Sequence, residues 1–122
     1  MGLQISVRES GDVAILDLQG RLATGEDCEL LSNKLRELID NGKSKLLLNL
    51  IKVAQIDSSG VSIIVKTHGS LKRRGGGLRL LGLGGHLLEV FKVLHLLEMI
   101  PSFEDETQAL ASFRPLGSIA KA

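Results

Sequence analysis

The residues Asp57, Ser58, Ser59 and Gly60 form a short polar step directly in front of an apolar repeat. A serine hydroxyl can serve as a nucleophile or accept a phosphate group, and both kinds of chemistry respond to nearby charge. Asp and Ser are also preferred at the N-cap of a helix, because their side-chain oxygens accept hydrogen bonds from unpaired amides of the first turn. The step therefore predicts a helix cap, a chemical site, or both.

A catalytic role for Ser58 would require a general base within hydrogen-bond reach. His68 lies on the same predicted helix, and at a rise of ~1.5 Å per residue the two are ~15 Å apart along the axis. A working pair needs ~3 Å. The other histidines, His86 and His95, are remote in sequence, and no G-x-S-x-G motif is present. We expect no enzyme and no catalytic residues, and a small hydrolase or phosphatase using Ser58 is the weakest alternative.

Modification of Ser58 is the other chemical possibility. A serine at the cap of a helix has its hydroxyl near solvent, and a phosphate there would carry about −1.5 to −2 charges. The helix N-terminus tolerates such a charge, with a gain of roughly 0.3–1 kcal/mol. A partner fitted to the bare hydroxyl would instead meet a dianion beside Asp57, and a loss of ~3 kcal/mol in binding lowers affinity roughly a hundredfold. Ser58 is therefore a candidate switch that acts on docking rather than on stability.

Length and composition favour one compact, aliphatic domain. The chain has 122 residues, 43% of them hydrophobic and only 2% aromatic, with a formal net charge of +1. Few aromatic side chains are available to stack on bases, and the overall charge does not attract a polyanion. The basic cluster Lys72-Arg73-Arg74 is typical of a solvated helix end. We expect no direct nucleic-acid partner.

Cysteine, histidine and hydropathy patterns predict neither a metal site nor a membrane span. Cys28 is the one cysteine, so no internal disulfide can form, and we expect it to be a small buried residue. The three histidines are not paired at metal-ligand spacing. We expect His68 to be a packing residue whose hydrogen bonds are satisfied. No apolar run approaches ~18 residues and no secretory leader is recognisable, so we expect a cytoplasmic protein.

Two glycine-containing segments lack the patterns of nucleotide-binding loops. Gly42-Lys43-Ser44 lacks the earlier glycine of a P-loop, since position 37 is Glu37, and it ends a predicted helix instead of opening one. The segment 82–85 follows a predicted strand, but the third glycine of a dinucleotide fingerprint is replaced by Leu87. We therefore expect no cofactor.

The hydrophobic period predicts alternating strands and helices. Period-two alternation predicts strands over 3–7 and 13–18, joined as an antiparallel hairpin, with a loop over 20–25. Apolar residues at a spacing of three and four then predict a helix over 26–41 with Thr24 as its N-cap. The continuous apolar run 45–50 is typical of a strand that is covered on both faces.

The second half of the chain continues this alternation. A helix begins at the DSSG step and ends at 75–77, a strand follows over 78–81, and a third helix covers 87–98. A short edge strand over 99–103 precedes a last helix, capped by Asp105 with Gln108 as its capping-box partner. Strands joined through helices should be parallel. The predicted fold is α/β, a single mixed sheet of about five strands with about four helices packed on it.

Four segments together resemble a known family. They are "LLLNL" at the end of a strand, "IDSSGV" at the start of a helix, "LKRRGGGLRLLG", and "VFKVLHLLEMIPSFED". The sequence resembles a STAS domain of the bacterial anti-sigma-factor antagonist type, and the resemblance extends from Leu3 to Phe113. It implies a single STAS domain over residues 1–113, and the aperiodic residues 114–122 are expected to be a flexible C-terminal tail.

The resemblance also implies a function and a set of site residues. In this family the first serine after the aspartate is phosphorylated by a partner kinase that is itself the anti-sigma factor, which assigns Ser58 as the acceptor. The unphosphorylated form binds the anti-sigma factor and releases a sigma factor, and a phosphatase resets the cycle. The residues implied in partner binding are Asp57, Ser58, Ser59, Gly60, Arg21 and Thr24.

One segment departs from the family pattern. The family often has Gly-Glu-Leu/Ile-Asp after the second strand, whereas this chain has Gly20-Arg21-Leu22-Ala23, so both acidic residues are replaced. This loop adjoins the serine in the family's fold, so the change affects the expected kinase contact. The alternative function is a STAS accessory module of a phospholipid transport or stress-sensing complex, which would use the same face without a phosphate cycle.

Overall fold

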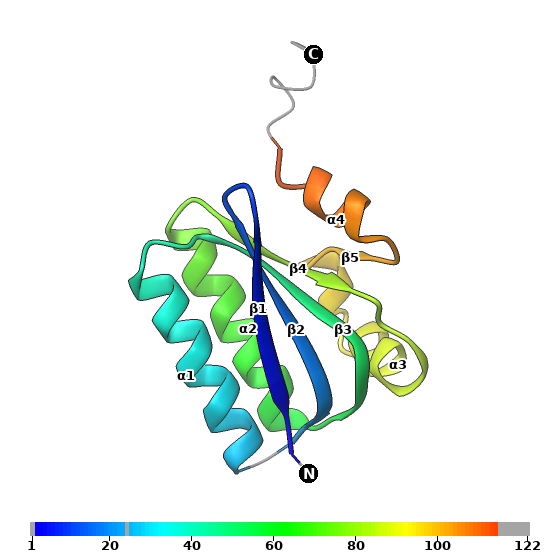
Figure 1. Cartoon of the computed structure of the whole chain (residues 1–122). Helices are drawn as coiled ribbons and strands as arrows, with labels where there is room; N and C mark the ends of the chain where they lie inside the picture. Colours follow the sequence, from blue (N-terminus) through cyan, green and yellow to red (C-terminus); the bar gives the residue numbers. More distant parts are fainter. Residues whose placement is uncertain (1, 24, 115–122) are drawn as a thin grey trace.

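The structure is a computed structural model that describes residues 2–23 and 25–114. Strands and helices alternate after an N-terminal hairpin, as the hydrophobic period predicts (Figure 1). The elements are β1 (Gln4–Ser10), β2 (Val13–Leu22), α1 (Glu26–Asp40), β3 (Lys45–Ile56), α2 (Ser58–Arg73), β4 (Gly77–Leu81), α3 (Gly85–Val93), the 3₁₀ turn η1 (Leu96–Glu98), β5 (Ser102–Phe103) and α4 (Glu106–Ala111).

The strands form one mixed sheet in the order β1-β2-β3-β4-β5. The hairpin strands β1 and β2 are antiparallel, and each later neighbour is parallel to the strand before it. This arrangement confirms the expected fold class and the expected strand directions. Parallel neighbours place the carboxyl ends of β2 and β3 at one edge of the sheet, where α1 and α2 begin.

The two faces of the sheet are covered unequally. On β3, Leu46, Leu48 and Leu50 belong to the larger core cluster, to which α1, α2 and α3 also contribute buried residues. Leu47 points to the opposite face, where α4 supplies Ala109 to a smaller cluster. This alternation explains the continuous apolar run, because both faces of β3 are buried at this level. Beyond α4, the second face is open toward the viewer in Figure 1.

Strand β3 contains two irregularities in its pairing with β2. Asp17 pairs with Asn49, but Gln19 pairs with Lys52, so β3 carries one more residue than β2 between these pairs. A second shift follows between Gly20 and Arg21. The Asn49 side-chain oxygen accepts a hydrogen bond of 3.1 Å from the Ile51 backbone N–H, inside the first irregularity. Such bulges bend a strand and increase its twist.

These irregularities explain why two strands are longer than predicted. Strand β2 extends to Leu22, although the glycine at position 20 indicated a loop, and β3 extends to Ile56 rather than to residue 50. The added residues pair with each other, Arg21 with Gln55 and Leu22 with Ile56. Polar side chains in the second half of β3 hid the strand from the hydrophobic pattern. The bulges and the uncovered face of the sheet accommodate these polar side chains in the second half of β3.

The remaining boundaries differ in smaller ways. The N-cap of α1 is Gly25, with φ 79°, rather than Thr24, and Thr24 lies outside the described residues. The third predicted helix divides into α3 and η1, because His95 adopts a left-handed φ of 57° between them. Strand β5 has only two residues.

The cap of α4 agrees with the sequence. Asp105 is its N-cap and accepts a hydrogen bond of 3.0 Å from the Gln108 backbone N–H. Most of the predicted C-terminal tail, residues 115–122, lies outside the described residues. Arg114 is described, and its backbone N–H donates to the Ala111 carbonyl at 3.0 Å.

His68 is buried in α2, as its position on the apolar stripe predicts, and only 7% of its surface is exposed. The expectation of satisfied hydrogen bonds is wrong for Nδ1, which has no partner among the described residues. Burial, assisted by the positive charges of Lys72 and Arg79, lowers the pKa of His68 below its ordinary value of 6.5. The imidazole is therefore neutral in the folded protein near neutral pH.

This buried imidazole predicts a loss of stability in mild acid. Unfolding exposes His68 and restores its ordinary pKa of 6.5, so below that pH the unfolded chain binds a proton that the folded chain resists. The free energy of unfolding should be greatest above pH 6.5 and fall as the pH drops toward the lowered folded pKa. Urea unfolding of wild type and His68→Leu between pH 5 and about 7.5 measures this.

The His68→Leu protein should show a flatter dependence on pH across this interval. Ser62→Leu, an apolar substitution at an exposed position of the same helix, supplies the control and should leave the pH dependence unchanged. Parallel pH curves for wild type and His68→Leu would contradict the assignment.

Candidate functional site

The DSSG step caps helix α2, and the cap is Asp57. Its backbone is extended, with φ −115° and ψ −175°, and its Oδ1 accepts hydrogen bonds from the backbone N–H groups of Ser59 at 3.0 Å and Gly60 at 3.1 Å. The capping interpretation of the sequence is therefore confirmed for the aspartate. Ser58 is not the cap but the first residue of the helix.

Ser58 is exposed, whereas the residues around it are progressively covered. Asp57 and Ser59 are half-buried and Gly60 is buried. The two first-turn amides that Asp57 satisfies belong to Ser59 and Gly60, so the cap does not require the Ser58 hydroxyl. The hydroxyl is thus available to an enzyme or a partner that approaches this edge of the sheet.

Gly60 brings the first turn of α2 against the end of β2. A Cβ atom at this position would lie 2.8 Å from the Leu22 carbonyl oxygen and 2.9 Å from Cγ1 of Ile56. The Asp57 backbone N–H also donates to the Leu22 carbonyl at 3.2 Å. Gly60, which the family resemblance placed among the partner-binding residues, is therefore an interior packing position that holds Asp57 and Ser58 in place.

Arg21 lies at the same edge of the sheet. It is exposed on β2 and pairs with Gln55 on β3, two residues before Asp57. The parallel pairing of β2 with β3 therefore joins the departing Gly20-Arg21-Leu22-Ala23 segment to the DSSG step, as the resemblance implied. Thr24, the remaining predicted partner-binding residue, is outside the described part of the chain.

The first turn of α1 adds negative charge beside this edge. It contains Glu26, Asp27 and Glu29. Burial raises the pKa of the Cys28 thiol, and the carboxylates of Asp57 and Asp27 raise it further. Cys28 on α1 is therefore within electrostatic range of Asp57, the N-cap of α2. Cys28 is buried as expected, with its thiol donating to the Ala23 carbonyl. Acidic residues therefore stand at the start of both α1 and α2.

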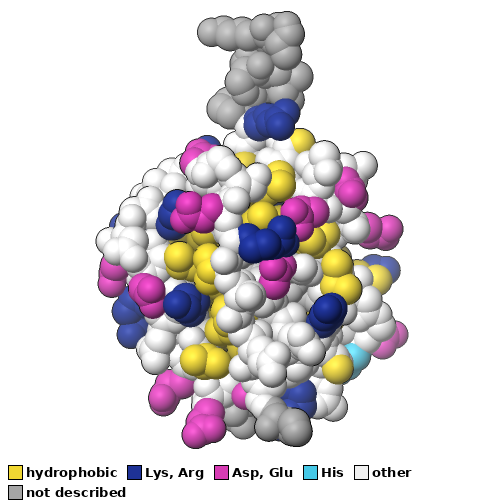
Figure 2. Space-filling view, in the orientation of Figure 1, with side chains coloured by type: hydrophobic (Ala, Val, Ile, Leu, Met, Phe, Trp, Pro, Cys, Tyr) yellow, Lys and Arg dark blue, Asp and Glu magenta, His cyan; other side chains and the backbone are white. Residues whose placement is uncertain are grey.

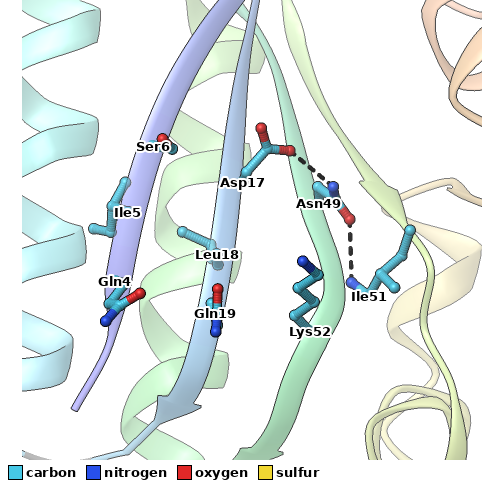
Figure 3. Close-up of a pocket in the computed structure, with 9 residues that line it drawn as sticks. All are labelled: Gln4, Ile5, Ser6, Asp17, Leu18, Gln19, Asn49, Ile51 and Lys52. Atoms are coloured by element: carbon cyan, nitrogen blue, oxygen red, sulfur yellow. Dashed lines mark hydrogen bonds between the residues drawn. The ribbon is translucent and has the colours of Figure 1, made fainter. Parts of the chain in front are cut away.

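A depression on the open face of the sheet was not foreseen from the sequence. Its volume is about 530 Å³, and it lies where the first bulge separates β3 from β2 (Figure 3). Asp17, Asn49 and Lys52 point toward it, and the Asn49 amide donates to Asp17 Oδ1 at 2.8 Å. The polar Asn49 inside "LLLNL" was the one sequence signal. None of the predicted site residues lines this depression.

Salt bridges on this face hold β1, β2 and α4 together. Arg8 binds Asp17 at 2.6 Å and Glu106 at 2.8 Å. The hydrogen bond from Arg8 is the main reason that the pKa of Asp17 is below its ordinary value, and Asn49 contributes as well. Figure 2 shows basic side chains against acidic ones in the middle of this face. Arg8, Asp17 and Glu106 are therefore paired with one another within the domain.

Within residues 2–23 and 25–114, no group of three or more His, Cys, Asp or Glu side chains is arranged to hold a metal ion. No helix in the same ranges has the length and apolarity needed to cross a membrane.

Comparison with known proteins identifies the family and supports the fold. A model of the STAS domain family matches residues 4–109, and the chain therefore belongs to that family. A protein of Bordetella bronchiseptica named "Putative anti-sigma factor antagonist BtrV" is 25% identical over 112 residues, which are 92% of this chain and 96% of the relative.

Two solved structures show the same fold. The crystal structure of TM1081 of Thermotoga maritima, described as "a putative anti-sigma factor antagonist", has a TM-score of 0.86 at 23% identity, covering 91% of this chain and 95% of that one. The phosphorylated form of SpoIIAA, a Bacillus cell fate determinant, has a TM-score of 0.72 at 20% identity, covering 91% of this chain and all of that one.

The close contact at Gly60 predicts opposite outcomes for two alanine substitutions in α2. Gly60→Ala should lower the free energy of unfolding by about 1–3 kcal/mol, because the new methyl group overlaps the Leu22 backbone. Gly69→Ala, whose Cβ would lie 3.6 Å from the flexible end of Arg73, should raise it by about 0.5–1 kcal/mol. Urea unfolding measures both. Equal effects of the two substitutions would contradict the packing described here.

Proposed function

We propose that this protein is an anti-sigma factor antagonist controlled by phosphorylation of Ser58. With Ser58 unmodified it binds an anti-sigma factor and so releases a sigma factor. The observation that carries the proposal is the exposed Ser58 hydroxyl beside the Asp57 cap of α2. The relatives named as antagonists, and the family resemblance of the DSSG step, support the same role.

The position of Ser58 explains how a phosphate would act. As the first residue of α2, Ser58 lies where the positive end of the helix dipole favours negative charge, by roughly 0.3–1 kcal/mol. The adjacent carboxylate of Asp57 opposes this gain, so the net effect on stability should be small. A partner that packs over the bare hydroxyl would, after phosphorylation, have to accommodate a dianion that no new positive charge neutralises.

The partners are those that the family resemblance implies. The anti-sigma factor is itself the serine kinase that transfers the phosphate from ATP to the Ser58 oxygen, and a phosphatase removes it by hydrolysis. Arg21 lies at the same edge, where the family often has an acidic residue, so the partner surface opposite it should be adapted to a cation. The protein supplies no catalysis of its own and acts in the cytoplasm, where sigma factors work.

Phosphate transfer to Ser58 can be tested with the anti-sigma factor kinase of the same organism and ATP. Wild-type protein should gain one phosphate, and Ser58→Ala should gain none, by intact mass measurement. Ser62→Ala is the control, because Ser62 is also exposed and lies one turn further along α2. Undiminished labelling of Ser58→Ala would reject Ser58 as the acceptor. Absent labelling with retained binding would instead favour an accessory STAS module.

A carboxylate at position 58 should separate docking from stability. Ser58→Asp should weaken binding to the anti-sigma factor. A loss of ~3 kcal/mol in binding free energy would lower the affinity roughly a hundredfold. The midpoint of thermal unfolding of Ser58→Asp should remain within a few degrees of wild type, since a change of about 1 kcal/mol corresponds to roughly 4–8 °C for a small domain. Ser62→Asp is the matched control and should bind normally. Equal affinities of Ser58→Asp and Ser62→Asp would contradict the proposal.

A further inference from the structure

Strand β1 is an outermost strand of the sheet, and its outer side is uncovered. It has seven residues, all of which pair with β2, and no other described strand lies on its outer side. All of its residues are exposed except Ile5, which is half-buried. The opposite edge differs, because β5 has two residues, follows Pro101 and packs beside α4. Of the two edges, only β1 offers a long row of unpaired backbone groups.

Several of the usual protections of an edge strand are missing from β1. Natural edges are shielded by proline, bulges, covering segments or charged side chains. β1 contains no proline, and its register with β2 is unbroken. Its two charged residues are engaged within the domain: Arg8 binds Asp17 and Glu106, and Glu9 binds Lys43 at 3.0 Å. Neither charge is therefore unpaired at the edge.

We propose that β1 pairs with β1 of a second copy of this chain, antiparallel and centred on Val7. In this register Val7 faces Val7 of the other copy, Ser6 faces Arg8, Ile5 faces Glu9 and Gln4 faces Ser10. Like charges do not stand directly opposite each other. The two Arg8 side chains are diagonal neighbours, and each is already paired with Asp17 and Glu106 of its own copy, which limits their repulsion. The two five-stranded sheets join into one continuous sheet.

Val7 supplies the apolar centre of this contact. Its side chain is 39% exposed, and its partner on β2 is the fully buried Leu16 of the larger core cluster. Val7 therefore lies at the margin of that core, on the face covered by the helices. A second Val7 across the edge extends the apolar face by one strand, and a two-fold pairing buries the same surface from both copies.

The dimer leaves the Ser58 site of each copy accessible. Ser58 lies at the carboxyl end of β3, and antiparallel pairing of the two β1 strands directs these ends away from each other. The Ser58 residues of the two copies thus lie at opposite ends of the joined sheet. The inference does not depend on the proposed regulatory function, and it holds equally for either use of that site.

Cysteine cross-linking tests the register. In the Cys28→Ser background, Val7→Cys should form an intermolecular disulfide with an added oxidant, because directly opposed residues have Cα atoms ~4.5–5.5 Å apart. Ile5→Cys on the same face is the matched control. Its two copies would be offset by four residues, about 14 Å at ~3.4 Å per residue, beyond the reach of a disulfide. Cross-linking of Ile5→Cys but not Val7→Cys would overturn the proposed pairing.

Sedimentation equilibrium of the full chain tests the dimer without a cross-link. Because one strand pair is smaller than a standard interface, measurements should extend to roughly 1 mM protein. Val7→Lys places two lysines opposite each other and should raise the dimer Kd tenfold or more, roughly. Val93→Lys, at a valine of α3 that is 74% exposed, should leave the Kd unchanged. A monomer at every concentration, or a dimer insensitive to Val7→Lys, would overturn the proposal.

Discussion

The close contact between the first turn of α2 and the end of β2 determines where the candidate site lies. Gly60 permits this contact because any side chain there would overlap the Leu22 carbonyl oxygen. The same carbonyl accepts the Asp57 backbone N–H, so the residue before the helix is bound to the neighbouring strand. With Asp57 held in this way, its carboxylate caps the helix and Ser58 emerges on the surface.

This constraint separates the stability of the domain from the chemistry of Ser58. The hydrogen bonds that cap the N-terminus of α2 come from Asp57 and from the backbone. The packing there comes from Gly60, Leu22 and Ile56. None of these contacts involves the serine hydroxyl. A charge added to Ser58 consequently meets the helix dipole and the neighbouring Asp57 carboxylate, whereas a docked partner would meet the charge directly. A position with this property suits reversible control of binding.

Local sequence signals were sufficient for most of the fold but not for features that depend on pairing. Alternation and helical spacing predicted the order of elements, the hairpin and the parallel strands, because those signals arise within single segments. The extension of β2 to Leu22 and of β3 to Ile56 depends on two bulges and an open sheet face, which a single strand does not encode. The cap was assigned to the right step, but only the geometry shows that Asp57 provides it and that Ser58 follows. The depression beside Asn49 likewise requires three strands to be assembled, so one polar residue in an apolar run was its only trace.

The most direct measurement compares the protein carrying phosphoserine at position 58 with the unmodified protein, in urea unfolding and in calorimetric titration with the anti-sigma factor kinase. The account predicts free energies of unfolding that agree within about 1 kcal/mol, as expected for a charge at an exposed helix N-terminus. It predicts affinities that differ by roughly a hundredfold, equivalent to ~3 kcal/mol. A phosphoserine that unfolds the domain, or one that leaves the affinity unchanged, would contradict it.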